Sequence, residues 1–424
     1  MDGRALYGPA ASIAGVVGIA VMPAGAYLYG RLGPQTQLWL STAVFLVGVT
    51  TTVTAVSMTM LIAGLAIRGL AAGLLAGLGL GVLSGIYEEP VDRERAFGLF
   101  ALMWVVPSLI GPLINSAILL SVGWRPAMAW PAILLLIGRA LVSRSLRRVV
   151  LDRPDAPPVL AGMPWFLVIA AGLVVAQVTV VVGSPLVLAA ALVAVAAVLV
   201  VAFRRAVSST TPARRRTQSG GWALALTCAG YFGVGAIVPL IAVVIIDPSG
   251  VLAAALVALG PLAWALLSAG RVGPRLSTSS ARIIAAAGFP LAAGLAAAGA
   301  LQAEEGVAGA VLLGAAVLVA GAAMGVIYPR IMTLAFVGFR ESSSITRAHG
   351  GVVLSLSEDV GTAVGATVLA GLGGVLVTTG AEAVAILLGA VALGLGAFWA
   401  MSSRGAVWEA DDAPGEATVR DRTQ

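Results

Sequence analysis

Gly-Arg-Leu-Gly-Pro at residues 30–34 and Gly-Arg-Val-Gly-Pro at residues 270–274 are two copies of one motif. Each copy follows a long apolar run and precedes another, and the same offset of 240 residues aligns Gly81 with Gly321. Internal repeats of this length in a very apolar chain are typical of membrane transporters built from two related halves. The motif pair therefore predicts a helical membrane protein with an internal repeat.

The repeat also predicts that the first half is one helix shorter than the second. In the second half, an apolar run over residues 222–246 precedes the run that leads into the motif. The first half begins with the motif-leading run itself, at residues 6–29. A truncated, inactive protein and a start codon placed too late would both show this pattern. Reading the DNA upstream of Met1 for an in-frame apolar run would separate the two.

Composition indicates a protein of the lipid bilayer. Hydrophobic residues make up 59% of the chain and charged residues 10%, against about 45–50% and about 25% in soluble domains. The net charge of +6 comes from arginines spread along the chain, which argues against a nucleic-acid partner. One cysteine and one histidine exclude an internal disulfide and a cysteine-based cluster, so neither a metal nor a cofactor is expected.

Apolar runs bounded by glycine, proline and charges predict an all-α protein with about 13 transmembrane helices. Five form an N-terminal bundle within residues 1–142, and six form a C-terminal bundle within residues 222–402. Between them, residues 143–221 hold an extra hairpin (165–203) flanked by basic linkers, and the tail at 403–424 is predicted to be disordered. The predicted helices span residues 6–29, 37–57, 59–87, 97–122, 126–142, 165–182, 185–203, 222–246, 251–269, 283–301, 307–328, 350–376 and 383–401.

Arginine placement predicts the topology. Alternate connections, beginning at residues 30–36, together hold 21 of the 25 arginines when the C-terminal tail is included. The opposite connections hold only Arg4 and Arg125. Because basic residues mark the cytoplasmic side, we expect an outside N-terminus and a cytoplasmic C-terminus in the plasma (inner) membrane.

Three motifs occur in a fixed order along the chain. Residues 26–34 read Ala-Tyr-Leu-Tyr-Gly-Arg-Leu-Gly-Pro, residues 98–116 contain Gly-Pro at 111–112, and residues 123–125 read Gly-Trp-Arg. This order resembles the major facilitator superfamily over nearly the whole chain. The hairpin between the halves resembles the fourteen-helix drug:proton antiporter branch of that superfamily, with the family's first helix absent.

In the loop motif, Leu28, Arg31 and Gly33 match the superfamily, whereas Gly30 stands where the family has Asp. The pattern predicts a tight turn, because Gly tolerates positive φ and Arg reaches carbonyl or carboxylate groups at neighbouring helix ends. The family implies a gating role, although Gly30 lacks the carboxylate that would latch the inner side. The alternative is a turn whose Arg only marks that side. The candidate gating residues are Gly30, Arg31, Gly33, Gly270, Arg271 and Gly273.

In the antiporter motif, Gly98, Gly111 and Pro112 match at the family's spacing, whereas Asn115 replaces a glycine. Gly111-Pro112 removes one backbone hydrogen bond and allows close helix approach. The family places this kink at the interface between the halves. Asn115, one turn further on, either faces the central cavity or bonds to a neighbouring helix.

Ionisable side chains inside apolar runs are costly in a bilayer. Arg68 matches the Arg of the family's fourth-helix motif and requires an anionic or carbonyl partner; the alternative is a snorkelling or carbonyl-paired structural Arg. Glu358 and Asp359 are the acids well inside an apolar run. Because a buried carboxyl can take up a proton at near-neutral pH, both are proton-coupling candidates. The alternative for Glu358 is a capping box with Ser355 at a helix start.

The sequence as a whole favours a secondary active transporter, and the resemblance implies proton-coupled export of an amphiphilic small organic molecule by a monomer. Its partners would be the lipid bilayer, this substrate and protons. An N-terminally truncated or inactive relative is the main alternative. A membrane-embedded lipid-modifying enzyme is a distant one, because the acid cluster at residues 88–94 alternates with arginine and reads as a solvated turn.

Overall fold

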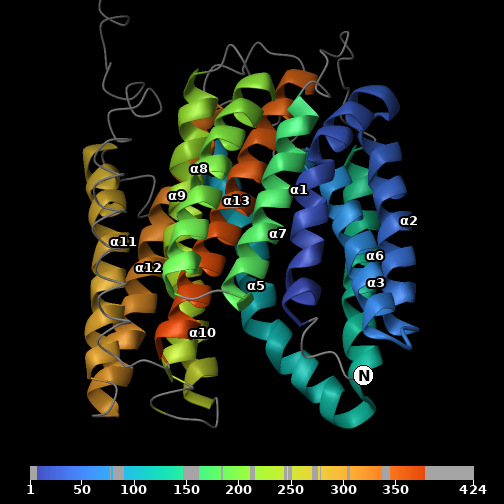
Figure 1. The fold of residues 1–424 in the computed structure, drawn as a ribbon. Coiled ribbons are helices and arrows are strands. Elements are labelled where there is room, and N and C mark those ends of the chain that lie inside the picture. Colours follow the sequence, from blue (N-terminus) through green and yellow to red (C-terminus); the bar gives the residue numbers. More distant parts are fainter. Residues whose placement is uncertain are drawn as a thin grey trace, which may run out of the picture.

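A computed structural model describes residues 7–76, 78–79, 90–146, 162–182, 185–210, 215–242, 246, 251–269, 276, 278–302, 306–336 and 344–377. Twelve α-helices and no strands occur in these ranges (Figure 1). Within the described ranges, six helices are long and apolar enough to cross a membrane by length and composition. The helices are α1 (Tyr7–Leu32), α2 (Pro34–Val53), α3 (Met58–Leu75), α5 (Pro90–Val122), α6 (Trp124–Leu146), α7 (Met163–Val182), α8 (Pro185–Thr210), α9 (Arg215–Ile241), α10 (Val251–Ala269), α11 (Thr278–Leu301), α12 (Val307–Ala335) and α13 (Ser344–Val377).

The all-α prediction is confirmed, and several helices are longer than expected. α5 begins at Pro90 rather than residue 97, α9 at Arg215 rather than 222, and α13 at Ser344 rather than 350. Hydropathy detects only the stretch that crosses hydrocarbon, whereas a helix can continue with polar residues beyond it. These extensions shorten the segments expected as linkers. The predicted helix at 383–401 and the tail lie outside the described residues.

Small residues set the packing of the first half, α1 to α6. α1 lies on α3 so closely that Gly69 and Gly73 have no room for a Cβ beside the carbonyls of Ala14 and Gly18. α2 packs on the other side of α3, and α6 packs on α2. Such backbone-to-backbone approach is how membrane helices associate without a hydrophobic driving force.

The second half, α9 to α13, is held in the same way. Gly321 of α12 faces the carbonyl of Gly260 on α10, while Gly361 of α13 faces the carbonyl of Ala225 on α9. α11 packs on α12 at the edge of the molecule. Figure 1 shows α9, α12 and α13 grouped beside α10 and α11. The internal repeat predicts that residues 6–142 superpose on residues 251–401, and this stays a prediction.

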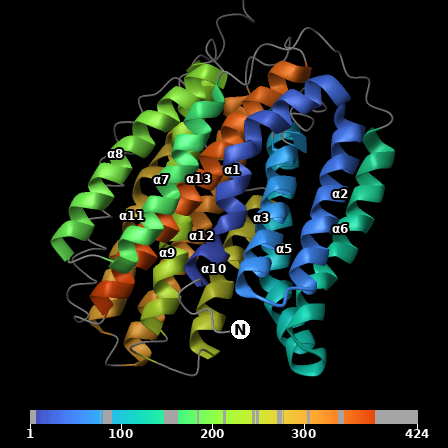
Figure 2. The same cartoon turned by 45° about the vertical axis from the view of Figure 1, so that its right-hand side comes forward.

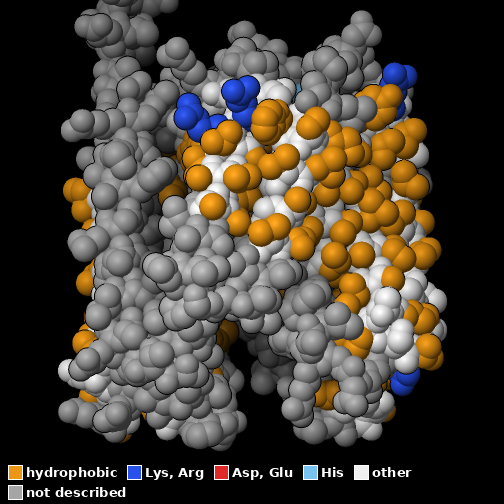
Figure 3. Space-filling model, in the orientation of Figure 1, with side chains coloured by type: hydrophobic (Ala, Val, Ile, Leu, Met, Phe, Trp, Pro, Cys, Tyr) orange, Lys and Arg blue, Asp and Glu red, His pale blue; other side chains and the backbone are white. Residues whose placement is uncertain are grey.

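Three sets of contacts join the halves. α5 packs against α10 and α12, and α1 packs against α13. The hairpin α7–α8 lies over this junction, and Figure 2 shows α7 alongside α1 and α13. Apolar side chains cover much of the visible described surface in Figure 3, which is the surface that a bilayer would solvate.

Candidate functional site

A partly open cavity of about 350 Å³ lies among the helices of the second half. It is bounded by four helices, α9, α10, α12 and α13, and its volume is in the range of small-molecule sites. Its side chains are apolar apart from the hydroxyl groups of Tyr231 and Thr362. The other lining residues are Phe232, Gly235, Ala236, Pro239, Val257, Pro261, Val317 and Ala320. The cavity could therefore hold a largely apolar ligand and offer it few hydrogen bonds.

Glu358 lies in the interior of α13, four residues before the cavity-lining Thr362. Four residues make about one helical turn, or about 6 Å along the axis. The side chain is 7% exposed, and the Tyr328 hydroxyl donates to its two carboxylate oxygens at 3.3 and 3.4 Å. Because α13 begins at Ser344, Ser355 and Glu358 do not form a capping box at a helix start.

Asp359 follows on the same helix and is half-buried. Successive helical residues point about 100° apart, so the two carboxyl groups leave α13 in different directions. In the described part of the chain, Glu358 has a hydrogen-bond partner from another helix, Tyr328 of α12, and Asp359 does not. The two proton-coupling candidates therefore occupy different environments.

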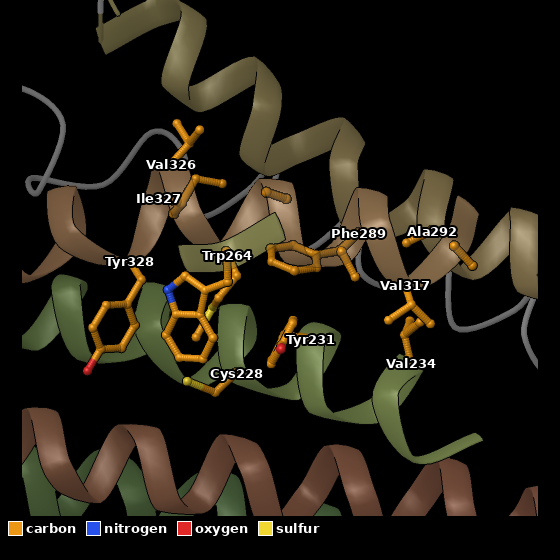
Figure 4. Packing of buried hydrophobic residues seen from close by; sticks show 14 of the residues in the cluster. Cys228, Tyr231, Val234, Trp264, Phe289, Ala292, Val317, Val326, Ile327 and Tyr328 are labelled. Carbon is orange, nitrogen blue, oxygen red and sulfur yellow. The ribbon is translucent and has the colours of Figure 1, made fainter. Parts of the chain in front are cut away.

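Three aromatic rings connect the cavity with Glu358, and we call Tyr231, Trp264 and Tyr328 the aromatic column. They come from α9, α10 and α12 and meet edge to face, with ring centroids 5.2 Å apart for the first pair and 5.5 Å for the second. Figure 4 shows the three rings in this order, with Cys228 beside Trp264. The indole Nε1 of Trp264 is buried without a hydrogen-bond partner in the described part of the chain. The column thus runs from the cavity wall to the carboxyl group.

Arg68 lies on α3, away from this cavity. Its guanidinium stands over the Phe45 ring at 5.3 Å, and its stem packs closely against Gly48 of α2. Within the described ranges it forms no ion pair, so the expected anionic partner is not found there. The contact is a cation–π interaction with a neighbouring helix.

The first loop motif forms the turn that the sequence predicts. Gly33 has φ 78° and is the N-cap of α2, and its amide donates to the Tyr29 carbonyl at 3.1 Å. Gly30 and Arg31 form the end of α1, where the Arg31 guanidinium stands 5.4 Å from the centroid of the Tyr27 ring. The second copy, with Gly270, Arg271 and Gly273, lies outside the described residues.

The first glycine of the antiporter motif, Gly98, lies against the second half of the protein. A Cβ on Gly98 would stand 2.6 Å from the Ser268 carbonyl oxygen of α10. Next to it, the rings of Phe97 and Phe336 stack with centroids 5.9 Å apart. Further along α5, Gly111 has open space around it, so the close approach between the halves occurs at Gly98. Pro112 follows Gly111 in the same helix.

Asn115 takes part in a contact between helices of the first half. Its Oδ1 accepts a hydrogen bond of 2.7 Å from the Trp130 indole of α6, and the side chain is exposed. Of the two expectations for Asn115, the structure thus shows the bond to a neighbouring helix.

Comparisons with the sequences of known proteins match only part of the chain. No protein-family profile matches the chain. The methylenomycin A resistance protein of Bacillus subtilis (strain 168) is 32% identical over 106 residues, which are 25% of this chain and 23% of that protein. A major facilitator superfamily multidrug transporter, mfsC, of Aspergillus fumigatus (strain ATCC MYA-4609 / CBS 101355 / FGSC A1100 / Af293) is 30% identical over 105 residues, 25% of this chain and 20% of that protein. The alignments thus span less than a quarter of each curated relative.

Solved structures match far more of the chain. The crystal structure of the human organic anion transporter MFSD10 (TETRAN) superposes with a TM-score of 0.64 at 15% identity, over 92% of this chain and 83% of that one. The E. coli fucose:proton symporter, FucP, gives 0.58 at 15% identity, over 94% and 91%. The chain has the major facilitator fold. The fold implied by the resemblance of the motifs to the major facilitator superfamily is confirmed.

Two polar side chains of this major facilitator fold were not predicted as structural ties. The buried Gln37 amide donates to the carbonyl groups of Gly25 on α1 and Leu74 on α3. Arg125 donates to the carbonyl groups of Val53 and Ala55 at 3.0 and 3.2 Å, which joins the end of α2 to the start of α6. The sequence places Arg125 in one of the connections opposite to the arginine-rich set and at the end of the Gly-Trp-Arg motif, and this motif was the available signal for its structural role.

Proposed function

We propose that the chain is a secondary active transporter that exports an amphiphilic small organic molecule in exchange for protons. The observation that carries this proposal is the pairing of a mostly apolar cavity with the buried Glu358 one helical turn away. A carboxyl group buried in a membrane protein is costly and marks a functional position by default. The fold supports alternating access, in which two halves rock around a central site.

The names of the relatives support export as the direction. One is named as a resistance protein and another as a multidrug transporter. In this proposal the cavity takes the substrate, and Glu358 with Asp359 takes the proton. The proposed setting is the plasma membrane, with the C-terminus in the cytoplasm and the protein acting as a monomer.

The test is uphill transport in proteoliposomes with an imposed pH gradient, using ethidium and a panel of other amphiphilic dyes as probes. Glu358→Gln and Asp359→Asn remove one carboxyl charge each. Asp92→Asn is the matched control, because Asp92 is exposed and its ion-pair partner in the described part of the chain is Arg95, one turn away. We expect loss of uphill accumulation in the coupling variants, retained exchange of labelled for unlabelled probe, and no change in the control. A variant that carries both changes is tested as well. If it accumulates probe uphill at the wild-type rate, Glu358 and Asp359 do not carry the proton. If the wild type moves none of the probes, export is refuted.

A further inference from the structure

The cavity and the carboxyl of Glu358 are joined by the aromatic column. Tyr231 lines the cavity at one end, and the Tyr328 hydroxyl contacts the carboxyl at the other. Trp264 packs between them and is 2% exposed, while Tyr328 is fully buried. Protein interiors are packed as densely as organic crystals. A displacement of the Tyr231 ring away from the cavity therefore presses on Trp264, which in turn packs against Tyr328.

We propose that Tyr328 is the positioning residue of the coupling carboxyl, and that ligand in the cavity acts through the aromatic column on the contact between the Tyr328 hydroxyl and Glu358. This inference rests on the proposed function, because it assigns the device that links its two sites. No residue of the column needs to bind a proton. The rings of the column pass on a displacement, and the hydrogen bond between Tyr328 and Glu358 changes in length.

The geometry leaves room for such a response. The hydroxyl stands 3.3 and 3.4 Å from the two carboxylate oxygens, whereas a well-formed O–H···O bond measures about 2.7–2.8 Å. A small shift of the Tyr328 ring therefore changes this hydrogen bond from weak to strong. The unpartnered Nε1 of Trp264 adds no hydrogen bond that would fix the ring between its neighbours in the described part of the chain.

The sign of the coupling follows from the donor. A hydroxyl can donate to an ionised carboxylate and favours that charged form. Pressure from the cavity that shortens the contact therefore favours release of the proton. Coupling between two sites is reciprocal, so a proton on Glu358 must weaken ligand binding by the same factor. Mutual opposition of this kind is what exchange of substrate for protons requires.

The groups facing Glu358 come from three helices. Asp359 is its neighbour on α13, Tyr328 projects from α12, and the buried Cys228 belongs to α9, which packs against α13. α1, α7 and α8 also pack against α13, and none of their described side chains forms an ion pair with Glu358. A titration of Glu358 therefore measures the effect of Tyr328 on proton binding, provided that the protonation of Asp359 is followed separately.

The test measures the pH at which Glu358 takes up a proton, without any ligand. The full chain in lipid nanodiscs is treated with dicyclohexylcarbodiimide, which reacts with protonated carboxyl groups, and modification of Glu358 and of Asp359 is resolved by mass spectrometry. Tyr328→Phe keeps the ring and removes the hydroxyl. We expect the Glu358 midpoint to move to higher pH by about half to one unit, a threefold to tenfold change in proton affinity. Tyr231→Phe is the control that removes the hydroxyl at the cavity end, and it should leave the midpoint unchanged.

A second arm mimics an occupied cavity. Gly235 lines the cavity, and no atom lies within 4 Å of the place that a Cβ would take, so Gly235→Phe puts a ring in the open space. We expect a midpoint at lower pH than in the wild type, and no such shift when Trp264→Ala interrupts the column. Gly294→Phe on α11 is the matched control, because Gly294 is equally open and lies outside the cavity lining.

An unchanged Glu358 midpoint in Tyr328→Phe overturns the inference, and so does a Gly235→Phe shift that persists in Trp264→Ala. Retained size-exclusion behaviour checks that each variant is folded. Because labelling needs no transported substrate, these failures are separable from failure of the proposed function. If the inference fails and the proposed function holds, Glu358→Gln still abolishes uphill transport.

Discussion

Gly98→Ala is expected to separate the halves at the end of the molecule where α5 begins and α10 ends. The added Cβ would stand 2.6 Å from the Ser268 carbonyl oxygen, a backbone atom that cannot rotate away. An ordinary contact begins at about 3.4 Å, so the helices must part by about 0.8 Å. Overpacking of this kind costs about 1–3 kcal/mol. Since only the arrangement that closes this contact carries that cost, its population should fall by about fivefold to 150-fold.

The matched control is Gly111→Ala. It adds the same methyl group to the same helix, at a position where no atom lies within 4 Å. Spin labels at Asp92→Cys and Ile283→Cys, both exposed, would report the distance between α5 and α11 by double electron–electron resonance in a Cys228→Ser background. We expect Gly98→Ala to populate a longer distance and Gly111→Ala to match the parent. Identical distributions for both variants would refute a close contact between the halves at Gly98.

Three further outcomes test other parts of the structure. Arg125→Gln removes both hydrogen bonds to the end of α2 and should lower stability by about 1–3 kcal/mol in thermal unfolding. Arg144→Gln, which alters an exposed residue, should leave stability unchanged. Equal melting temperatures for the two variants would contradict a stabilising role of these hydrogen bonds. Gly33→Ala places a Cβ at φ 78° and should cost about 1–2 kcal/mol, with the open helical Gly15 as the control site for Gly→Ala; a neutral Gly33→Ala would show that the turn relaxes. A reporter fused at Gln424 should be active only in the cytoplasm, and external activity would reverse the topology that arginine placement predicts.

The sequence predicted the helices well because length and apolarity decide which segments cross a bilayer. Twelve of the 13 predicted helices have a counterpart in the described ranges. Their ends were less predictable, as at α9, where the helix starts with arginines that hydropathy excludes. Gly33 was predictable because a tight turn between two helices needs positive φ, a local requirement visible in five residues.

The candidate site was predictable only in part. Glu358 was found from its chemistry, since a carboxyl inside an apolar run is conspicuous. The aromatic column was missed because Tyr231, Trp264 and Tyr328 come from three helices, and an aromatic residue in an apolar run carries no signal of its own. For the same reason, the sequence predicted an anionic or carbonyl partner for Arg68 and gave no indication of the Phe45 ring over which it lies. Contacts between distant segments depend on packing that local patterns do not encode.

The central claim is that substrate and protons are exchanged through Glu358, and proton flux driven by substrate tests it most directly. Proteoliposomes carrying an entrapped pH-sensitive dye, without a pH gradient, would receive an outward gradient of whichever amphiphilic dye the wild type transports. The account predicts that protons move inward as the compound leaves, and that Glu358→Gln still releases the compound without moving protons. Compound efflux from the wild type with no proton movement, or full proton movement in Glu358→Gln, would contradict it.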